Sequence, residues 1–419
     1  MVNTIDLFAG CGGLTEGFKQ SGHYNTIACI EWDKAPCDTL RHNLLKKWKY
    51  TDADKRVIQF DIQRTNELIN GWDDPEYGKS EGLDSLVKEY GGTVDLIIGG
   101  PPCQAYSVAG RIRDKDGMKN DYRNYLFENY TEIVKHYKPK AFVFENVPGI
   151  LSARPGDGER LIIDIIKEKF RETGYVILDD LSQAIIDFTE YGVPQNRSRI
   201  IILALRKDCF ENPEQLLEKF YKEVLPSKKV EKPCTVREAI SDLPALYPLD
   251  SPRKIGSKTY SHSFPDESFT ILNHLPRFSS KRDIDIFKLL TEDIESGRNE
   301  YVSTDALKRL YTKITGKTSN IHKYHVIRWD EPSNTIPAHL YKDGLRHIHP
   351  DSKQLRTITV REAARLQTFP DDYEFITGTA LDYKMIGNAV PPLFAKLLAD
   401  SIYDFLFKQE DNYANTRTV

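Results

Sequence analysis

The stretch NTIDLFAGCGGL, residues 3–14, runs from an apolar segment into a glycine-rich turn. A short apolar run bounded by glycine is typical of a buried strand, and glycine permits the tight turn that leads from a strand into a helix. We therefore expect residues 6–14 to end the first strand and to start a helix. In an open α/β sheet, ligands bind beyond the carboxyl ends of the strands, which is where this turn would lie.

Six further apolar runs follow in the first half of the chain, at intervals that suit βαβ units. They read TIACIEW (26–32), RVIQFDI (56–62), VDLIIGG (94–100), AFVFENV (141–147), YVILDDL (175–181) and RIIILAL (199–205). Amphipathic segments between them, such as 124–137 and 159–173, are predicted helices. Strands that alternate with helices indicate an α/β fold with a doubly wound, mostly parallel sheet.

After residue 206 the sequence becomes polar, rich in histidine and interrupted by proline, which indicates a second domain. Clear helix signals return near the C-terminus, where Thr359 and Glu362 form a predicted capping box. The pentapeptide TVREA of that box also occurs at 235–239, and we interpret it there as a second, similar helix start. We expect a first domain over 1–206, a second over 207–350, and a C-terminal segment, 351–419, that returns to the first.

Composition excludes several classes of protein. The 419-residue chain has six cysteines and a formal net charge of -4, but no C-x-x-C pair and no cluster of cysteine with histidine, which argues against a metal site or a disulfide framework. Neither a secretory signal nor a membrane-spanning run is evident, so we expect a cytoplasmic protein without membrane partners. Residues 251–360 carry 18 Lys and Arg against 13 Asp and Glu, so a local basic patch remains compatible with nucleic acid.

The residues around the first turn suit a nucleoside cofactor. Glu31 follows the second predicted strand, where its carboxylate can accept both hydroxyls of a ribose. Trp32 offers a face for adenine, and Asp61, after the third strand, can accept from its amino group. The spacing departs from the dinucleotide pattern G-x-G-x-x-G, because Thr15 stands at the third position, so S-adenosylmethionine suits the site better. A purely structural glycine turn remains an alternative.

The stretch GGPPCQAYS, residues 99–107, places Cys103 behind two prolines at the end of a predicted strand. A single cysteine at such a place is more often a small buried apolar residue than a nucleophile. Three features favour a catalytic role: Glu145 ends another strand, Arg197 and Arg199 precede the strand RIIILAL, and GNAVPP at 387–392 precedes a C-terminal helix.

Taken in order, the segments DLFAGCGGL, EWD, FDI, GGPPCQAYS, FENV, QNRSR, TVREAARLQTFPD and GNAVPP resemble the motifs of DNA (cytosine-5-)-methyltransferases of the bacterial restriction-modification type. The resemblance covers residues 4–205 and 325–400. It implies a Rossmann-like, S-adenosylmethionine-dependent methyltransferase domain with a smaller, irregular target-recognition domain. It also implies methylation of carbon 5 of a flipped-out cytosine in a specific double-stranded DNA sequence, with S-adenosyl-L-homocysteine as the product.

The same resemblance assigns roles to individual residues. Cys103 is implied to be the nucleophile that adds to carbon 6 of cytosine, because a thiolate there makes carbon 5 nucleophilic enough to take the methyl group. Glu145 is implied to engage N3 and the exocyclic amine, and Arg199, with Arg197, the O2 oxygen. The implied cofactor contacts are Phe8, Gly10, Gly12, Gly13, Glu31, Trp32, Asp61, Ile62, Pro102, Leu126, Asn388 and Val390. Of these, Phe8, Leu126 and Val390 could equally be core residues.

The family's DNA contacts correspond to a loop after the nucleophile, and we assign Gln104, Ser107, Arg111 and Arg113 to them. The implied partners are double-stranded DNA and a restriction endonuclease that acts on the same site, and the chain is expected to be a monomer. Two alternatives remain open: a tRNA cytosine-5 methyltransferase, and a catalytically silent DNA-binding regulator. A dinucleotide-dependent oxidoreductase is a more distant third.

Overall fold

The computed structural model describes residues 1–102, 125–154, 160–319, 324–342 and 344–408, and the structural statements below refer to these residues. The chain forms two compact units. The first consists of Met1–Gly192, Arg197–Glu231 and Ala389–Val419, and the second of Val193–Asn196 and Lys232–Asn388. The chain therefore passes between the units several times.

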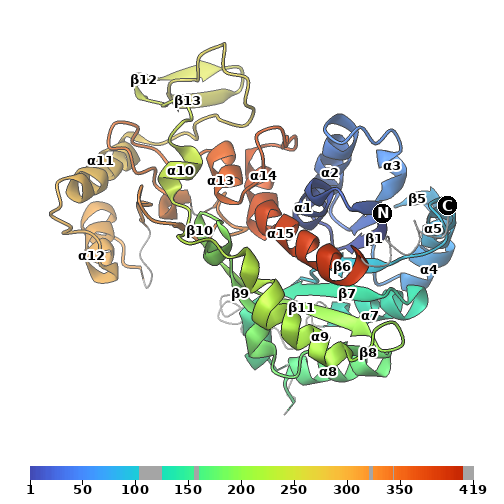
Figure 1. Cartoon of the computed structure of the whole chain (residues 1–419). Coiled ribbons are helices and arrows are strands. Elements are labelled where there is room, and N and C mark those ends of the chain that lie inside the picture. The colour runs from blue at the N-terminus through green and yellow to red at the C-terminus, as the bar shows by residue number, and fades with distance from the viewer. Residues whose placement is uncertain (103–124, 155–159, 320–323, 343, 409–419) are drawn as a thin grey trace. The chain divides into compact units, whose positions relative to one another are not determined.

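The first unit is built on an eight-stranded sheet (Figure 1). Its strands are β1 (Val2–Leu7), β2 (Tyr24–Glu31), β3 (Val57–Gln59), β6 (Leu96–Gly99), β7 (Ala141–Asn146), β8 (Tyr175–Ile177), β9 (Ile185–Asp187) and β11 (Ser198–Arg206). The order is β3-β2-β1-β6-β7-β11-β8, and β9 also pairs with β11. The pairs from β3 to β7 are parallel, whereas β11 is antiparallel to β7, β8 and β9. All seven predicted strands are present, and the predicted fold class is confirmed.

Helices complete the first unit. They are α1 (Gly13–Ser21), α2 (Lys34–Lys46), α3 (Ala53–Arg56), α4 (Thr65–Asn70), α5 (Gly82–Glu89), α7 (Leu126–Tyr137), α8 (Ile162–Glu172), α9 (Pro213–Lys219) and α15 (Pro392–Ile402). Short 3-10 turns occupy Pro148–Ser152, Leu181–Ala184, Phe188–Tyr191 and Pro226–Lys228, and π-helical turns occupy Phe220–Val224 and Tyr403–Phe407. A small hairpin joins β4 (Trp72–Asp74) to β5 (Gly78–Ser80). β6 and the first four residues of β7 are apolar and buried, because helices cover both faces of the sheet.

Most residues of the second unit lie in loops, and its regular structure is largely helical. It contains α10 (Val236–Ile240), α11 (Lys281–Glu295), α12 (Thr304–Thr315), α13 (Val360–Leu366), α14 (Thr379–Asn388) and a 3-10 turn at Gly344–Arg346. β10 (Gln195–Asn196) pairs in parallel with β14 (Ser333–Asn334), and β12 (Pro248–Ile255) forms an antiparallel hairpin with β13 (Lys258–His262). An apolar cluster that includes Phe287, Leu290 and Leu310 holds α11 and α12 together. The sequence had suggested irregular structure here, so these two helices were not foreseen.

The bounds of the two units differ from the domain bounds predicted at residues 206 and 350. Residues 207–231 belong to the first unit because α9 packs on β11 and the buried Tyr221 hydroxyl hydrogen-bonds to the backbone of Ile201 and Leu203. Residues 351–388 belong to the second unit, where α13 packs on α10. The chain returns to the first unit only at Ala389.

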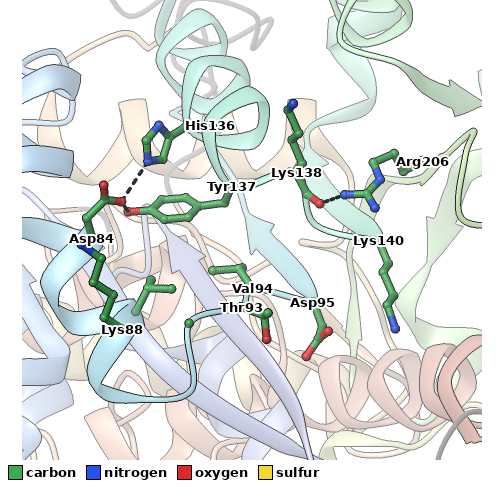
Figure 2. A pocket seen from close by; sticks show the side chains of 12 residues that line it. Asp84, Lys88, Thr93, Val94, Asp95, His136, Tyr137, Lys138, Lys140 and Arg206 are labelled. Carbon is green, nitrogen blue, oxygen red and sulfur yellow. Dashed lines mark hydrogen bonds and ion pairs between the residues drawn. The ribbon is translucent and has the colours of Figure 1, made fainter.

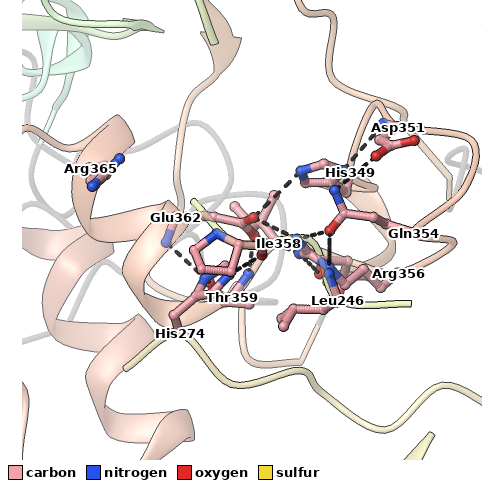
Figure 3. Close-up of polar contacts among 12 residues, drawn as sticks. Leu246, His274, His349, Asp351, Gln354, Arg356, Ile358, Thr359, Glu362 and Arg365 are labelled. Atoms are coloured by element: carbon pink, nitrogen blue, oxygen red, sulfur yellow. Dashed lines mark hydrogen bonds and ion pairs between the residues drawn. The ribbon is translucent and has the colours of Figure 1, made fainter. Parts of the chain in front are cut away.

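Both copies of TVREA begin a helix with a complete capping box, as predicted. In the second copy the Glu362 carboxylate does more than cap α13. It also forms a buried ion pair with both terminal nitrogens of Arg356 at 2.7 Å, and His349 lies 3.5 Å from it (Figure 3). Arg356 and nearby charges hold the pKa of Glu362 well below its usual range despite burial. This pair fixes α13 to the loop that precedes it.

Candidate active site

The strand order places the candidate site between β1 and β6. The chain winds in opposite directions from these neighbouring strands, and in open α/β sheets ligands bind beyond the carboxyl ends of the strands at such a switch point. Leu7 and Gly99, the last residues of the two strands, pair with each other in the sheet. The glycine turn follows Leu7, and the Gly-Pro-Pro segment follows Gly99. Two of the predicted motifs therefore meet at one edge of the sheet.

The turn after β1 has an unusual backbone. Phe8, Gly10 and Gly12 all have positive φ angles, of 60°, 56° and 82°, and Gly12 is the N-cap of α1. This left-handed region is costly for a residue with a side chain, so Phe8 is strained. A Cβ atom on Gly10 would meet nothing within 4 Å, which leaves open space beside the turn. The backbone is thus shaped to approach a ligand closely.

Glu31, the last residue of β2, is attached to this turn. One carboxylate oxygen accepts a hydrogen bond from the Gly10 N–H at 2.9 Å, and the other accepts from the Asp33 N–H at 2.8 Å. Burial raises the pKa of Glu31, while these backbone bonds lower it. The carboxylate is therefore held in one orientation at the edge of the turn, half-buried, where a ligand can reach it. Trp32 beside it is 51% exposed.

Gly13 has a packing role. A Cβ atom there would lie 2.3 Å from the Val390 carbonyl oxygen, so only glycine fits against this backbone. Val390 is buried and lies in the segment that has just returned to the first unit. The structure thus brings the predicted Gly13 and Val390 together. Asn388, also predicted, is the exposed last residue of α14 in the second unit.

The remaining predicted cofactor residues divide into two groups by exposure. Asp61 is half-buried after β3 and accepts a hydrogen bond from the Gln63 N–H at 3.0 Å, which closes a short turn. Pro102 is also half-buried. Ile62 and Leu126 are 6% and 5% exposed, so the fold alone accounts for their apolar character.

Glu145 and Arg199 form an ion pair beside the carboxyl end of β7, the strand next to β6. Glu145 lies near the end of β7 and Arg199 near the start of the antiparallel β11, and Nε of Arg199 lies 3.0 Å from Oε1 of Glu145. Burial raises the pKa of Glu145, while the guanidiniums of Arg199 and Arg197 oppose that rise. Both partners retain some exposure, so the pair borders space that a substrate can enter.

Arg197 is placed differently. It is 2% exposed, and its Nη2 donates to the Ala389 carbonyl at 3.1 Å. It therefore links the approach to β11 with the C-terminal segment and contributes positive charge near Glu145. Of the two predicted arginines, Arg199 is the one paired with Glu145.

The segment before Cys103 is fitted closely to its neighbours. A Cβ atom on Gly99 would lie 2.3 Å from the Leu7 carbonyl oxygen, and one on Gly100 would lie 2.3 Å from Oε2 of Glu145. The Asn146 side chain donates to the Pro101 carbonyl at 3.2 Å. The sequence analysis missed Gly100 and Asn146, although their position beside Pro-Pro and beside Glu145 could have indicated both.

Asp6 is a further residue that the sequence analysis did not single out for its side chain. It is fully buried beneath the glycine turn and accepts a hydrogen bond from the Thr15 hydroxyl at 2.6 Å. Burial raises its pKa to about 7, although this bond lowers it. Its other oxygen has no hydrogen-bond partner among the described residues. Asp6 thus connects β1 to α1 under the turn.

The predicted nucleophile Cys103 and the predicted DNA contacts Gln104, Ser107, Arg111 and Arg113 lie outside the described residues. A separate cavity of about 420 Å³ lies at the amino ends of β6 and β7, at the opposite end of the strands from the candidate active site. It is lined by polar side chains such as Asp84, His136 and Arg206 (Figure 2). His136 and Tyr137 both hydrogen-bond to Asp84 there. This cavity is distinct from the candidate active site.

The family of the chain follows from its match to a known family profile. The profile of the family described as C-5 cytosine-specific DNA methylase matches residues 2–404. The chain belongs to this family. The prediction of a DNA cytosine-5 methyltransferase is thereby confirmed, and methyltransferases of this kind use S-adenosylmethionine. Among the helices of the described residues, none combines the length and apolarity needed to cross a membrane.

Curated relatives of this C-5 cytosine-specific DNA methylase support the same family assignment. The chain is 36% identical to the type II methyltransferase M.Bpa9945I of Bacillus paralicheniformis, over 96% of this chain and 98% of the relative. It is 34% identical to the type II methyltransferase M.DdeI of Desulfomicrobium norvegicum, over 96% and 88%. The crystal structure of the S. pombe Dnmt2 methyltransferase shares the fold, with a TM-score of 0.54 at 14% identity over 98% of this chain and 99% of that one.

Proposed function

We propose that this methylase transfers the methyl group of S-adenosylmethionine to carbon 5 of a flipped-out cytosine in a specific double-stranded DNA sequence, through a covalent adduct with Cys103. The observation that carries the proposal is the Glu145–Arg199 pair, which lies against Gly100 in the segment that leads to Cys103. A carboxyl of raised pKa beside a guanidinium can bind a ring that offers both a donor and an acceptor.

The residues at the end of β1 fit S-adenosylmethionine. The open space beside Gly10 suits the methionine chain of the cofactor. The Glu31 carboxylate, held at the edge of that space by the Gly10 N–H, suits the ribose, and the half-exposed Trp32 suits the adenine. We assign the cofactor contacts to this group, with Phe8, Gly12, Asp61 and Pro102, and with Val390 from the C-terminal segment. The bound cofactor supplies an electrophilic methyl group on a sulfonium centre.

The chain's own groups then carry the base through addition and elimination. The Cys103 thiolate adds to carbon 6, and the electron pair of the carbon 5–carbon 6 bond moves to carbon 5, which takes the methyl group and leaves S-adenosylhomocysteine. Transfer of the proton on carbon 5 to a water molecule leaves its electron pair to restore the double bond, which expels the thiolate. Glu145 holds N3 and the exocyclic amine, and Arg199 holds O2 as negative charge develops. Carbon 6 is inaccessible in a stacked duplex, so the base must be extruded.

We assign DNA recognition to the second unit, which contains residues 251–360 with their local excess of Lys and Arg over Asp and Glu. The two curated relatives named above are type II methyltransferases, which supports a restriction endonuclease with the same target as a partner.

Bisulfite sequencing of a plasmid from a methylation-deficient host that expresses this chain tests the proposal. We expect protected cytosines at one short recurring sequence, and none with Cys103→Ser. If bisulfite converts every cytosine of the plasmid although the expressed protein is folded and binds S-adenosylmethionine, DNA is excluded as the substrate. Equal protection by the Ser variant would exclude the covalent mechanism.

A further inference from the structure

The β12–β13 hairpin of the second unit is exposed along most of its length. Residues 250–259 are all exposed, and burial begins only at the base of β13, with Ser261 and His262. Gly256, at a positive φ of 59°, begins the two-residue turn at the tip. An isolated two-stranded hairpin gains little stability in water unless it buries an apolar face. The outer hairpin therefore does not contribute to the core of its unit.

The tip of the hairpin carries a concentrated positive charge. Arg253, Lys254 and Lys258 lie within six positions, and Asp250 is the one acidic residue of the two strands. Ile255 pairs with Lys258 and Arg253 with Tyr260. Because directly paired residues and alternate residues share a face, Arg253, Ile255, Lys258 and Tyr260 lie on one face of the ribbon and Lys254 on the other. Both faces thus present a cation.

These cations have no charged partner among the described residues, unlike those of α11 in the same unit. On α11, Lys281 pairs with Asp285 at 2.9 Å and Lys288 with Glu292 at 3.8 Å, and Arg282 contacts Asp283. No ion pair or side-chain hydrogen bond involves Arg253, Lys254 or Lys258 in the described part of the chain.

A second hairpin among the described residues, β4–β5, provides another contrast. β4–β5 buries Trp72 against Phe60, and its Lys79 lies 3.3 Å from Asp73. β4–β5 thus buries an apolar side chain and pairs its lysine within the protein, whereas residues 250–259 of β12–β13 are exposed and their cations have no charged partner among the described residues.

We propose that the β12–β13 hairpin binds the phosphates of double-stranded DNA as a ribbon that lies in the major groove. This inference rests on the proposed function, which makes DNA the substrate. The major groove, about 12 Å wide, admits a two-stranded ribbon. Phosphates flank the groove on both sides, and cations on both faces of the ribbon complement them. Phosphate contacts position a protein on the duplex and make its affinity depend on salt.

The test compares two triple variants of the full chain by fluorescence anisotropy. One carries Arg253→Gln, Lys254→Gln and Lys258→Gln; the control carries Lys281→Gln, Arg282→Gln and Lys288→Gln. The probes are two 30-base-pair duplexes, one with and one without the sequence found by bisulfite sequencing. Dissociation constants are measured over a series of salt concentrations with S-adenosylhomocysteine present. The affinity of each variant for S-adenosylhomocysteine, compared with that of the wild type, shows whether the first unit is intact.

We expect the slope of log affinity against log salt to fall by about 1 for each hairpin cation removed, and both duplexes to bind more weakly. The α11 control should retain the wild-type slope. Three results would overturn the inference while leaving the proposed function intact. They are a wild-type salt slope in the hairpin variant, an equal fall of the slope in the α11 control, and weaker binding to only one of the two duplexes. If the wild type methylates no sequence but binds the second duplex, the proposed function fails, and the hairpin inference is decided by the salt slopes on that duplex alone. Wild type that binds neither duplex overturns both.

Discussion

Gly99 and Gly100 show how two adjacent residues of the same type meet different demands. Gly99 lies against the carbonyl of Leu7, so it allows β1 and β6 to pair at their carboxyl ends. Gly100 lies against the carboxylate of Glu145, so it allows that side chain to occupy the space above the segment that leads to Cys103. The first glycine serves the sheet and the second serves the site.

Alanine substitutions should separate these two roles. Gly99→Ala should destabilise the first unit by about 1–3 kcal/mol, because the added methyl group meets backbone that cannot move away. Gly100→Ala meets the end of a side chain and should displace Glu145, so that the rate of methyl transfer falls at least tenfold while S-adenosylmethionine still binds. Urea denaturation, cofactor titration and single-turnover methylation measure these effects. Full activity in Gly100→Ala would contradict the importance of the Glu145 position.

At the residue scale, it was easier to predict which residues lie close together than which contacts they make. Glu145 and Arg199 were predicted to share a site, and the structure adds that they form an ion pair. Gly13 was predicted as a cofactor residue, but its fit against Val390 depends on a segment more than 370 positions away. Asn146 was missed because its role is a hydrogen bond to the distant Pro101 carbonyl, and its position beside Glu145 was the available signal.

At the scale of elements, the two TVREA helices form a natural matched pair. Both α10 and α13 begin with a capping box, but the Glu238 side chain is 47% exposed, whereas that of Glu362 is 1% exposed and paired with Arg356. The same five residues thus make a surface helix start in one place and the anchor of a buried network in the other.

Replacement of each glutamate by glutamine should reveal this difference. Glutamine can still cap the helix, so Glu238→Gln should cost less than about 1 kcal/mol. Glu362→Gln leaves the Arg356 charge buried without compensation and should destabilise the second unit by about 3–5 kcal/mol. Urea denaturation measures both, and adding Arg356→Met to Glu362→Gln should recover part of the loss. Equal effects at the two positions would show that the buried ion pair adds nothing to capping.

Elements were predictable where periodicity was strong. Buried strands such as β6 and β11 read as uninterrupted apolar runs, and the capping boxes were visible as a four-residue pattern. α11 and α12 were missed because their many charged residues resembled solvated loops. Their N-terminal serines, Ser280 and Ser303, both accept a capping hydrogen bond and were the available signal.

At the scale of the whole molecule, an early helix, α1, and a late helix, α15, pack together in the first unit. α1 and α15 approach closely because α1 carries small residues: a Cβ atom on Gly17 would lie 2.4 Å from Cβ of Ala395 and 2.5 Å from the Pro392 carbonyl oxygen. The Tyr24 hydroxyl donates to the Ala399 carbonyl at 2.8 Å and adds a second link to the same helix. The last helix is therefore an integral part of the unit that begins the chain.

Gly17→Ala tests this packing. Alanine favours an isolated helix over glycine, yet here it should destabilise the protein by about 1–3 kcal/mol because the methyl group overlaps α15. Cofactor affinity should fall as well, since Gly13 and Val390 meet at the same contact. Thermal or urea denaturation and cofactor titration provide the readouts. Adding Ala395→Gly should restore part of the stability; a Gly17→Ala variant more stable than wild type would contradict the close approach.

The bounds of the two units could not be predicted from composition. Residues 207–231 look like the polar segment that follows them, but Leu217, Phe220 and Tyr221 are buried in the first unit. Only tertiary packing distinguishes this segment from its neighbours. Likewise, nothing in the sequence around residue 388 marks the return of the chain.

The late return of the chain has a consequence during biosynthesis. Ribosomes add about 5–20 residues per second, so roughly 20–80 s separate the synthesis of α1 from that of α15. Throughout that interval the small-residue face of α1 has no partner, and the first unit cannot complete its fold. A nascent or truncated polypeptide that lacks α15 is therefore expected to be inactive, so methylation should begin only with molecules whose synthesis has passed α15.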